Sequence, residues 1–192
     1  MKKILIGTHN RGKYREISYL ISKKFKKISP ISLKLASPKE IGKTFHENSK
    51  LKAIYFSKYV NYPVISDDSG LCIKSLNNKP GIHSARLAKK YGSFFVAMKH
   101  ILKKMNKKKN RSAYFICCLS FKNTKGKTIT VEGRVYGKIS EKILGKKGFG
   151  YDPIFIPNSS KITFGQMSYR KKLNMDHRFI AFKKLKKKIK IL

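Results

Sequence analysis

The sequence has very few acidic residues. Of its 192 residues, 9 are Asp or Glu and 46 are Lys or Arg, which gives a formal net charge of +37. A charge excess of this size attracts polyanions such as nucleic acid, an anionic membrane or phosphorylated small molecules. Because lysine fills exposed positions along the whole chain, each remaining acid is a candidate for a specific task.

Cysteine is also scarce. The three cysteines are odd in number, and Cys117 and Cys118 are adjacent within the apolar run "YFICCLSF". Neighbouring residues of a strand point to opposite faces. We therefore expect packed thiols here, and in Cys72, rather than a disulfide or a zinc site.

Long apolar runs are missing. No stretch approaches the length of a membrane span. The early run "ILIG" is too short for the core of a secretory signal. Hydrophobic residues still make up 41% of the chain, enough for a sizeable core. We expect a soluble cytoplasmic protein whose residues 1–192 form a single domain.

Lysine is the most conspicuous residue that is present. It occurs in every segment, with runs at 23–27, 103–109 and 183–190. A dedicated nucleic-acid binder tends to gather its basic residues on one face or tail. The even spread favours compositional drift, although a functional polyanion-binding surface remains an alternative.

Strand and helix patterns alternate early in the chain, and a hairpin comes late. The expected strands lie at 2–7, near 27–33, and at 63–66, 71–76, 111–122, 127–138 and 151–156. The expected helices lie at 13–25, from a capping box of Thr44 and Glu47 onward, at 91–105, and from after Asp176 to residue 192. This order predicts an α/β protein with a mixed sheet flanked by helices.

Two acids stand side by side in "PVISDDSGL" (63–71). The pattern predicts that Asp67 and Asp68 lie where a strand meets a tight "DSG" turn, a usual place for sites in open α/β sheets. Carboxylates suit Mg²⁺, which shares its shell with water and substrate phosphates. The alternative is that Asp67 and Ser69 only form the turn.

The loop "GTHNRGK" (7–13) offers a phosphate-binding signal. It matches the first seven places of the Walker A pattern between a strand and a helix, but Tyr14 stands where that pattern needs Ser or Thr. A P-loop NTPase is therefore one candidate. Amide groups at a helix start together with Lys13 bind phosphate without that motif.

The segment "GKKGFGYDPIFIP" (145–157) is rich in glycine before an aromatic strand. Phe149 and Tyr151 could stack a base, and the glycines let the backbone approach a ligand. A plain hairpin turn is the alternative. His177 and Arg178 present hydrogen-bond donors at a helix start, where such a pair is also common on an ordinary surface.

Taken in order, these segments resemble the Ham1 family, the inosine triphosphate pyrophosphatases that act on non-standard purine nucleoside triphosphates. The matching stretches span nearly the whole chain, and the succession "DDSGL", "GFGYDPIF" and "HR" is the most specific. They are "THNRGKYRE" (8–16), "TFHENSKLKA" (44–53), "SDDSGL" (66–71), "PGIHSAR" (80–86), "EGRVYGKI" (132–139), "GFGYDPIF" (148–155) and "KKLNMDHR" (171–178).

The resemblance implies an elongated mixed sheet in two lobes, with the nucleotide in a cleft between them. It implies hydrolysis to the monophosphate and pyrophosphate with Mg²⁺ as cofactor, by a homodimer that binds no specific nucleic acid and no membrane. Asp68 would be the catalytic base and a metal ligand, Glu40 the other metal carboxylate, and Asp67 and Arg86 supporting residues.

The resemblance also implies a set of substrate-binding residues. The triphosphate would be held by the loop Thr8, His9, Asn10, Arg11, Gly12 and Lys13, with Lys52 and Lys172, while Ser69 contacts substrate. The base pocket would be formed by Phe149, Gly150, Tyr151 and Asp152 with His177 and Arg178. Asp176 and Phe179 depart from the family pattern of Ser and Gly at those places, which bears on base preference.

The chemistry agrees with these roles. Asp68 with Mg²⁺ can activate water near phosphorus, and Lys13, Lys52 and Lys172 can spread the developing negative charge. Hypoxanthine and xanthine carry a 6-oxo acceptor where adenine has an amino donor, so donors in the pocket select against adenine. Besides the P-loop NTPase, a non-enzymatic polyanion binder is the remaining alternative.

Overall fold

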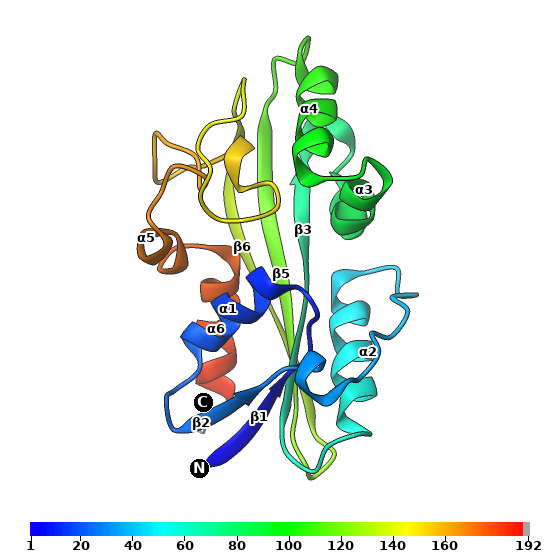
Figure 1. Ribbon diagram of the computed structural model, residues 1–192. Coiled ribbons are helices and arrows are strands. Elements are labelled where there is room, and N and C mark those ends of the chain that lie inside the picture. The colour runs from blue at the N-terminus through cyan, green and yellow to red at the C-terminus, as the bar shows by residue number, and fades with distance from the viewer. Residues whose placement is uncertain (190–192) are drawn as a thin grey trace. The chain divides into compact units, whose positions relative to one another are not determined.

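A mixed β-sheet flanked by helices forms the frame of the protein (Figure 1). The computed structural model describes residues 1–189. The strands are β1 (Lys2–Ile6), β2 (Phe25–Ile28), β3 (Val64–Ile73), β4 (Lys79–Pro80), β5 (Ser112–Lys122), β6 (Thr128–Ile139) and β7 (Phe155–Pro157). The helices are α1 (Arg11–Leu20), α2 (Phe45–Ser57), α3 (Ser84–Lys90), α4 (Phe94–Met105), α5 (Tyr169–Leu173) and α6 (His177–Lys188).

The strand order is β2-β1-β3-β5-β6-β7, and β4 pairs with β3. Strand β1 runs parallel to both β2 and β3, whereas β4 is antiparallel to β3 and β7 is antiparallel to β6. The predicted α/β class with a mixed sheet is therefore confirmed. No helix within residues 1–189 is long and apolar enough to cross a membrane.

The chain divides into two compact units. The first unit contains Met1–Asp68, Cys117–Gly133 and the segment from Arg178 onward, and the second contains Ser69–Ile116 and Arg134–His177. Strands β3, β5 and β6 therefore each contribute residues to both units. Two of the passages fall at predicted site residues, between Asp68 and Ser69 and between His177 and Arg178.

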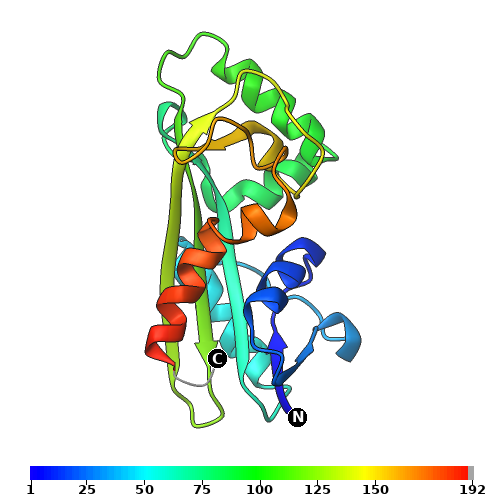
Figure 2. The same cartoon turned by 90° about the vertical axis from the view of Figure 1, so that its left-hand side faces the viewer.

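Both faces of the sheet are covered in the first unit. Figure 1 shows α2 on one side of the strands and α1 with α6 on the other, and Figure 2 views this unit from the α6 side. Leu5 and Val64 pack against Phe56 of α2, while Ile4, Ile6 and Ile65 belong to the core under α1 and α6. The alternation follows from the two-residue period of a strand.

The predicted "DSG" turn at Asp68–Gly70 is wrong, because these residues lie within the strand β3. The two strands expected at 63–66 and 71–76 are one continuous strand, Val64–Ile73, through both acids. Gly70 is explained by close packing: a Cβ there would lie 2.3 Å from the Gly81 carbonyl oxygen and 2.6 Å from Ser84 Oγ. The glycine permits close approach of another backbone segment rather than a chain reversal.

Several boundaries also differ from the prediction. The helix expected at 13–25 ends at Leu20, and the strand expected near 27–33 ends at Ile28, because Pro30 cannot donate to a ladder and leads into a 3₁₀ turn. The short helices α3 and α5 were not predicted, since five to seven residues show no clear period. Residues 190–192 of the last predicted helix lie outside the described residues.

The predicted capping box at the start of α2 is present in part. Thr44 Oγ1 accepts the Glu47 N–H at 3.1 Å, as expected. The Glu47 carboxylate accepts the N–H of Lys43 rather than that of Thr44, at 2.6 Å. Both contacts bind amide groups at the helix start, which fixes where α2 begins.

Arg111 ties three segments of the second unit together. Its guanidinium donates to the carbonyl oxygens of Ile139 at 2.8 Å and Met105 at 3.1 Å, and also to that of Ser140. Met105 ends α4, and Ile139 ends β6. A planar group with several fixed donors is needed to reach three carbonyls at once.

We predict that Arg111→Lys lowers the free energy of unfolding by about 2–3 kcal/mol, because one ammonium cannot satisfy all three carbonyl groups. Urea denaturation followed by circular dichroism measures the change. Arg170→Lys, at an exposed position on α5, is the matched control and should change stability by less than about 0.5 kcal/mol. Equal stability of the two variants would contradict the role assigned to Arg111.

Candidate active site

Asp67 and Asp68 lie on opposite faces of the sheet. They are consecutive residues of the continuous strand β3 and are 0% and 4% exposed. Ile65 belongs to the core under α1 and α6, so Asp67, two residues on, points to that face. Val64 belongs to the core under α2, so Asp68 points toward α2. The two carboxylates therefore have separate surroundings.

Asp67 is surrounded by cations. Its Oδ2 lies 3.1 Å from Lys13 Nζ and 3.6 Å from Arg178 Nε. The Arg178 guanidinium also donates to Glu16 Oε2 at 2.7 Å, and Glu16 is 1% exposed. Burial alone would raise the pKa of Asp67, but Lys13, Arg178 and Lys52 outweigh it and lower the pKa to about 2. Asp67 is thus ionised at neutral pH and orients Lys13 and Arg178.

Asp68 belongs to a second group on the α2 side. Its Oδ2 accepts a hydrogen bond from Asn48 Nδ2 at 3.2 Å, and its Oδ1 lies 4.0 Å from Lys52 Nζ. Lys52 Nζ lies 2.6 Å from Glu40 Oε1. The pKa of Asp68 is raised, mainly by burial and further by Glu40 and Asp67, although Lys13 and Lys52 oppose the shift. A carboxylate of raised pKa is a stronger base than an exposed one.

Lys52 stays charged despite its burial. Burial lowers the pKa of an ammonium, but Asp67, Asp68 and Glu40 raise it more, so the pKa of Lys52 is above its ordinary value. The pKa of Glu40 is lowered: burial opposes the shift, and the contact with Lys52 outweighs it. The α2 side thus holds two carboxylates around one ammonium.

The predicted phosphate loop precedes α1. Asn10 caps this helix, with its Oδ1 accepting the Lys13 N–H at 3.0 Å, and Thr8 Oγ1 accepts the Asn10 N–H at 3.2 Å. His9 is held by the Leu35 carbonyl oxygen at 2.9 Å, and Arg11 is exposed at the helix start with Gly12 after it. The loop therefore fixes the start of α1, from which Lys13 reaches Asp67.

The predicted base-binding loop, Phe149 to Asp152, lies in the second unit together with Lys172. Asp152 Oδ2 accepts the Phe149 N–H at 2.8 Å and a hydrogen bond from Lys172 Nζ at 2.6 Å. Lys172 Nζ also lies 4.7 Å from the centroid of the Phe149 ring. Lys172, predicted with the triphosphate, is therefore placed beside Phe149 and Asp152. The ring of Phe149 therefore lies next to the buried ion pair of Lys172 and Asp152.

Two glycines and Tyr151 shape that loop. Gly148 and Gly150 have φ of +75° and +66°, and a Cβ on Gly148 would lie 2.1 Å from Asp152 Oδ2. Tyr151 is 2% exposed, donates to the Ser84 carbonyl oxygen at 2.9 Å and contacts the Phe94 ring edge-on. Its ring supports the loop, so Phe149 is the better candidate to stack a base.

The remaining predicted residues have varied surroundings. The His177 ring stacks on Phe115 at 4.9 Å and is 3% exposed. Arg86 is exposed on α3, with Nη1 3.3 Å from His83 Nδ1. Ser69 is half-buried at the first position of the second unit. Asp176 is fully buried directly before α6.

This chain resembles known proteins over nearly its whole length. The model of the Ham1 family matches residues 4–188. This chain belongs to the Ham1 family. Among its relatives, a protein of Caulobacter vibrioides named dITP/XTP pyrophosphatase is 39% identical over 186 residues, covering 96% of each chain. A protein of the same name from Bacillus subtilis is 38% identical over 192 residues, covering 97% of this chain and 96% of the relative.

Solved structures give the same assignment for this Ham1-family protein. The Ham1 protein of Staphylococcus aureus superposes with a TM-score of 0.87 at 33% identity, covering 98% of both chains. A Ham1 protein from Coxiella burnetii gives a TM-score of 0.88 at 30% identity and covers both chains fully.

The P-loop alternative finds no support in this Ham1-family fold. Tyr14 occupies the place of the Walker A Ser or Thr, and its hydroxyl donates to the Lys27 carbonyl oxygen at 3.1 Å. Asp67 forms an ion pair with Lys13, the lysine that a P-loop would direct to the phosphates. Neither residue is arranged to hold the metal of a P-loop.

The carboxylates on the α2 side fit a divalent cation whose coordination shell would be filled by water and phosphate oxygens. Glu40 and Asp68 both face the ammonium of Lys52, so this position already favours positive charge. Within residues 1–189 no three His, Cys, Asp or Glu side chains cluster to hold a metal by themselves. Mg²⁺ commonly takes one or two carboxylates and fills its shell with water and phosphate oxygens.

Two residues of the site were not predicted from sequence. Glu16 is the buried partner of Arg178, and Asn48 is the hydrogen-bond donor to Asp68. Both lie inside segments that matched the family. The scarcity of acids could have drawn attention to Glu16, whereas Asn48 carried no signal beyond a polar residue inside a helix.

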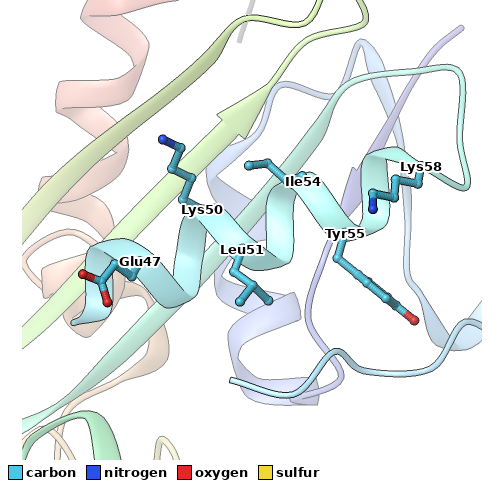
Figure 3. A pocket seen from close by; sticks show the side chains of 6 residues that line it. All are labelled: Glu47, Lys50, Leu51, Ile54, Tyr55 and Lys58. Atoms are coloured by element: carbon cyan, nitrogen blue, oxygen red, sulfur yellow. The ribbon is translucent and has the colours of Figure 1, made fainter. Parts of the chain in front are cut away.

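A separate hollow of about 450 Å³ lies on the outer face of α2 (Figure 3). Its lining is Glu47, Lys50, Leu51, Ile54, Tyr55 and Lys58, spaced three and four residues apart. The site residues Asn48 and Lys52 occupy the buried face of the same helix. The hollow is therefore distinct from the two carboxylate groups.

The low pKa of Asp67 makes stability depend on pH. Its folded-state pKa, about 2, lies below the ordinary 3.8, so the ionised form stabilises the fold above pH 3.8, and this contribution is lost as pH falls toward 2. We expect about 2 kcal/mol from this group, at about 1.4 kcal/mol per unit. Urea unfolding between about pH 5 and about pH 1, which is roughly one unit beyond each of the two pKa values, measures this contribution.

Asp67→Asn should reduce the slope of the unfolding free energy against pH, because roughly one proton fewer is taken up when the protein unfolds in acid. Glu141→Gln removes an exposed acid outside the site and serves as the matched control. If Asp67→Asn kept the slope of the wild-type protein, the ion pairs of Asp67 would not account for acid stability.

Proposed function

We propose that this protein hydrolyses non-standard purine nucleoside triphosphates such as ITP, dITP and XTP to the nucleoside monophosphate and pyrophosphate. The observation that carries the proposal is the pair of adjacent carboxylates on opposite faces of β3, one tied to Lys13 and the other beside Lys52 and Glu40. The relatives named dITP/XTP pyrophosphatase support the choice of substrate.

In the proposed reaction a water molecule attacks the α-phosphorus, and the bond between the α and β phosphates breaks. Asp68 accepts the proton of the attacking water, and pyrophosphate leaves. Lys13 and Lys52, both near the carboxylates, offset the charge that develops on the phosphate oxygens. Mg²⁺ held by Asp68 and Glu40 would supply Lewis-acid stabilisation of these oxygens.

The base is proposed to contact Phe149, His177 and Arg178. Phe149 would stack on the purine, while donors from His177, Arg178 and the backbone would bind the 6-oxo group. An adenine amino group would leave those donors unsatisfied, a costly mismatch in a buried pocket.

Assembly, partners and compartment are also part of the proposal. We infer a homodimer from the family resemblance, which sedimentation equilibrium of the purified protein would test. The lysines occur in every segment, which supports attraction of free nucleotides rather than a specific nucleic-acid site. The proposed activity implies the cytoplasm, where the nucleotide pool is held.

Product analysis tests the function directly. Purified protein with Mg²⁺ should convert ITP, dITP and XTP to monophosphate and pyrophosphate much faster than ATP or GTP, because the 6-oxo group and the pocket donors match. Chromatography with a pyrophosphate assay measures both products. Orthophosphate as the first product would contradict the reaction type, and equal rates on all substrates would contradict the selectivity.

Asp68→Asn should lower kcat by about 10²–10⁴-fold, the range contributed by a general base. The change keeps the shape of the side chain, so the thermal unfolding midpoint should stay close to that of the wild-type protein. Glu141→Gln, an exposed acid-to-amide change, is the matched control with full activity. An Asp68→Asn variant with wild-type turnover would show that another group accepts the proton.

A further inference from the structure

We propose that Asn48 is a positioning residue that holds the Asp68 carboxylate and the loop carrying Glu40 in one fixed arrangement. The inference rests on the proposed function, since Asp68 and Glu40 act in that reaction. Asn48 lies in the first turns of α2 and is fully buried. Its side-chain amide contacts two different segments of the first unit.

The two contacts use opposite ends of the amide. Asn48 Nδ2 donates to Asp68 Oδ2 at 3.2 Å, and Asn48 Oδ1 accepts the N–H of Gly42 at 2.8 Å. The reversed amide would point an oxygen at a carboxylate and an NH₂ group at an N–H. The network therefore permits one orientation of the side chain.

The loop that contains Gly42 lies in close contact with the first turn of α2. A Cβ on Gly42 would lie 2.7 Å from Asn48 Oδ1 and 2.8 Å from the Cβ of Glu47, so a larger residue there must displace the loop. Glu40 stands two residues before Gly42. The position of the Glu40 carboxylate thus depends on how firmly Gly42 is bound to α2.

Asn48 and Lys52 act from the same face of α2, one turn apart. Lys52 contacts Glu40 and Asp68 through charge, whereas Asn48 contacts Gly42 and Asp68 through a neutral amide. An acid at position 48 would repel Asp68, and a further cation would oppose its role as a base. Asn supplies a donor and an acceptor without changing the charge of the group.

This arrangement predicts an effect on turnover rather than on substrate binding. Both ends of the Asn48 amide are engaged within the protein, and the side chain is buried, so it offers no group to the substrate. Misplacing a catalytic group by about 1 Å can cost about 10²-fold in rate. The loss should therefore appear in kcat and not in KM.

Two variants test the two contacts separately. Asn48→Asp keeps the acceptor for Gly42 but replaces the donor to Asp68, and it should lower kcat for ITP at least about tenfold with KM within about twofold. Gly42→Ala leaves Asn48 in place but displaces the loop, and it should lower kcat in the same way. Each variant is assayed well below its own thermal unfolding midpoint.

Ser49→Ala is the matched control. Ser49 is the next residue of α2 and is equally buried, but its hydroxyl bonds to Ser120 Oγ at 2.8 Å and to the His46 carbonyl oxygen. It should lower the unfolding midpoint and leave kcat unchanged. If Asn48→Asp and Gly42→Ala kept wild-type kcat, or lost it no more than Ser49→Ala does, the inference would be overturned.

Amide hydrogen exchange gives a readout without turnover. Exchange at Gly42 should be slow in the wild-type protein and in Asn48→Asp, and at least about tenfold faster in Asn48→Ala, which lacks the acceptor. A wild-type protein that does not hydrolyse ITP would contradict the proposed function instead. Equal Gly42 exchange in the wild type and Asn48→Ala would then still overturn the inference that Asn48 holds the loop.

Discussion

The uninterrupted course of β3 through Asp67 and Asp68 is the constraint on which the site depends. Because consecutive strand residues face opposite sides, the two carboxylates point toward different sets of side chains. One side brings Lys13, Arg178 and Glu16 to Asp67, and the other brings Asn48 and Lys52 to Asp68. The different pKa shifts of the two acids follow from this separation.

Burial beside a cation describes the position of several of the nine acids. Glu16, Asp67, Asp68 and Asp152 are buried, and each lies close to a lysine or arginine. Removing one member of such a pair leaves an uncompensated charge, which is far more costly than exchanging a surface residue. In a chain of net charge +37, these acids also neutralise the lysine and arginine side chains that lie beside them.

The local patterns predicted most of the regular structure correctly. The apolar run of β1, the Thr44 cap of α2 and the long β5–β6 hairpin follow from short-range preferences. The predicted "DSG" turn was wrong because Gly70 has two possible reasons: chain reversal, or the close approach of Gly81 that the fold shows. Sequence alone does not separate them, since the second involves residues distant in the chain.

The sequence by itself determined the α/β class, the strand that begins before the acids, the loop before α1 and the membership of site residues in matching segments. Tertiary structure alone decided which cation meets which acid, that Lys172 lies beside Phe149 and Asp152, and that Asn48 joins Asp68 to Gly42. The physical reason is the distance along the chain over which each kind of interaction acts. Periodicity and capping act within a few residues, whereas ion pairs and buried amides join segments whose separation along the chain carries no local signal.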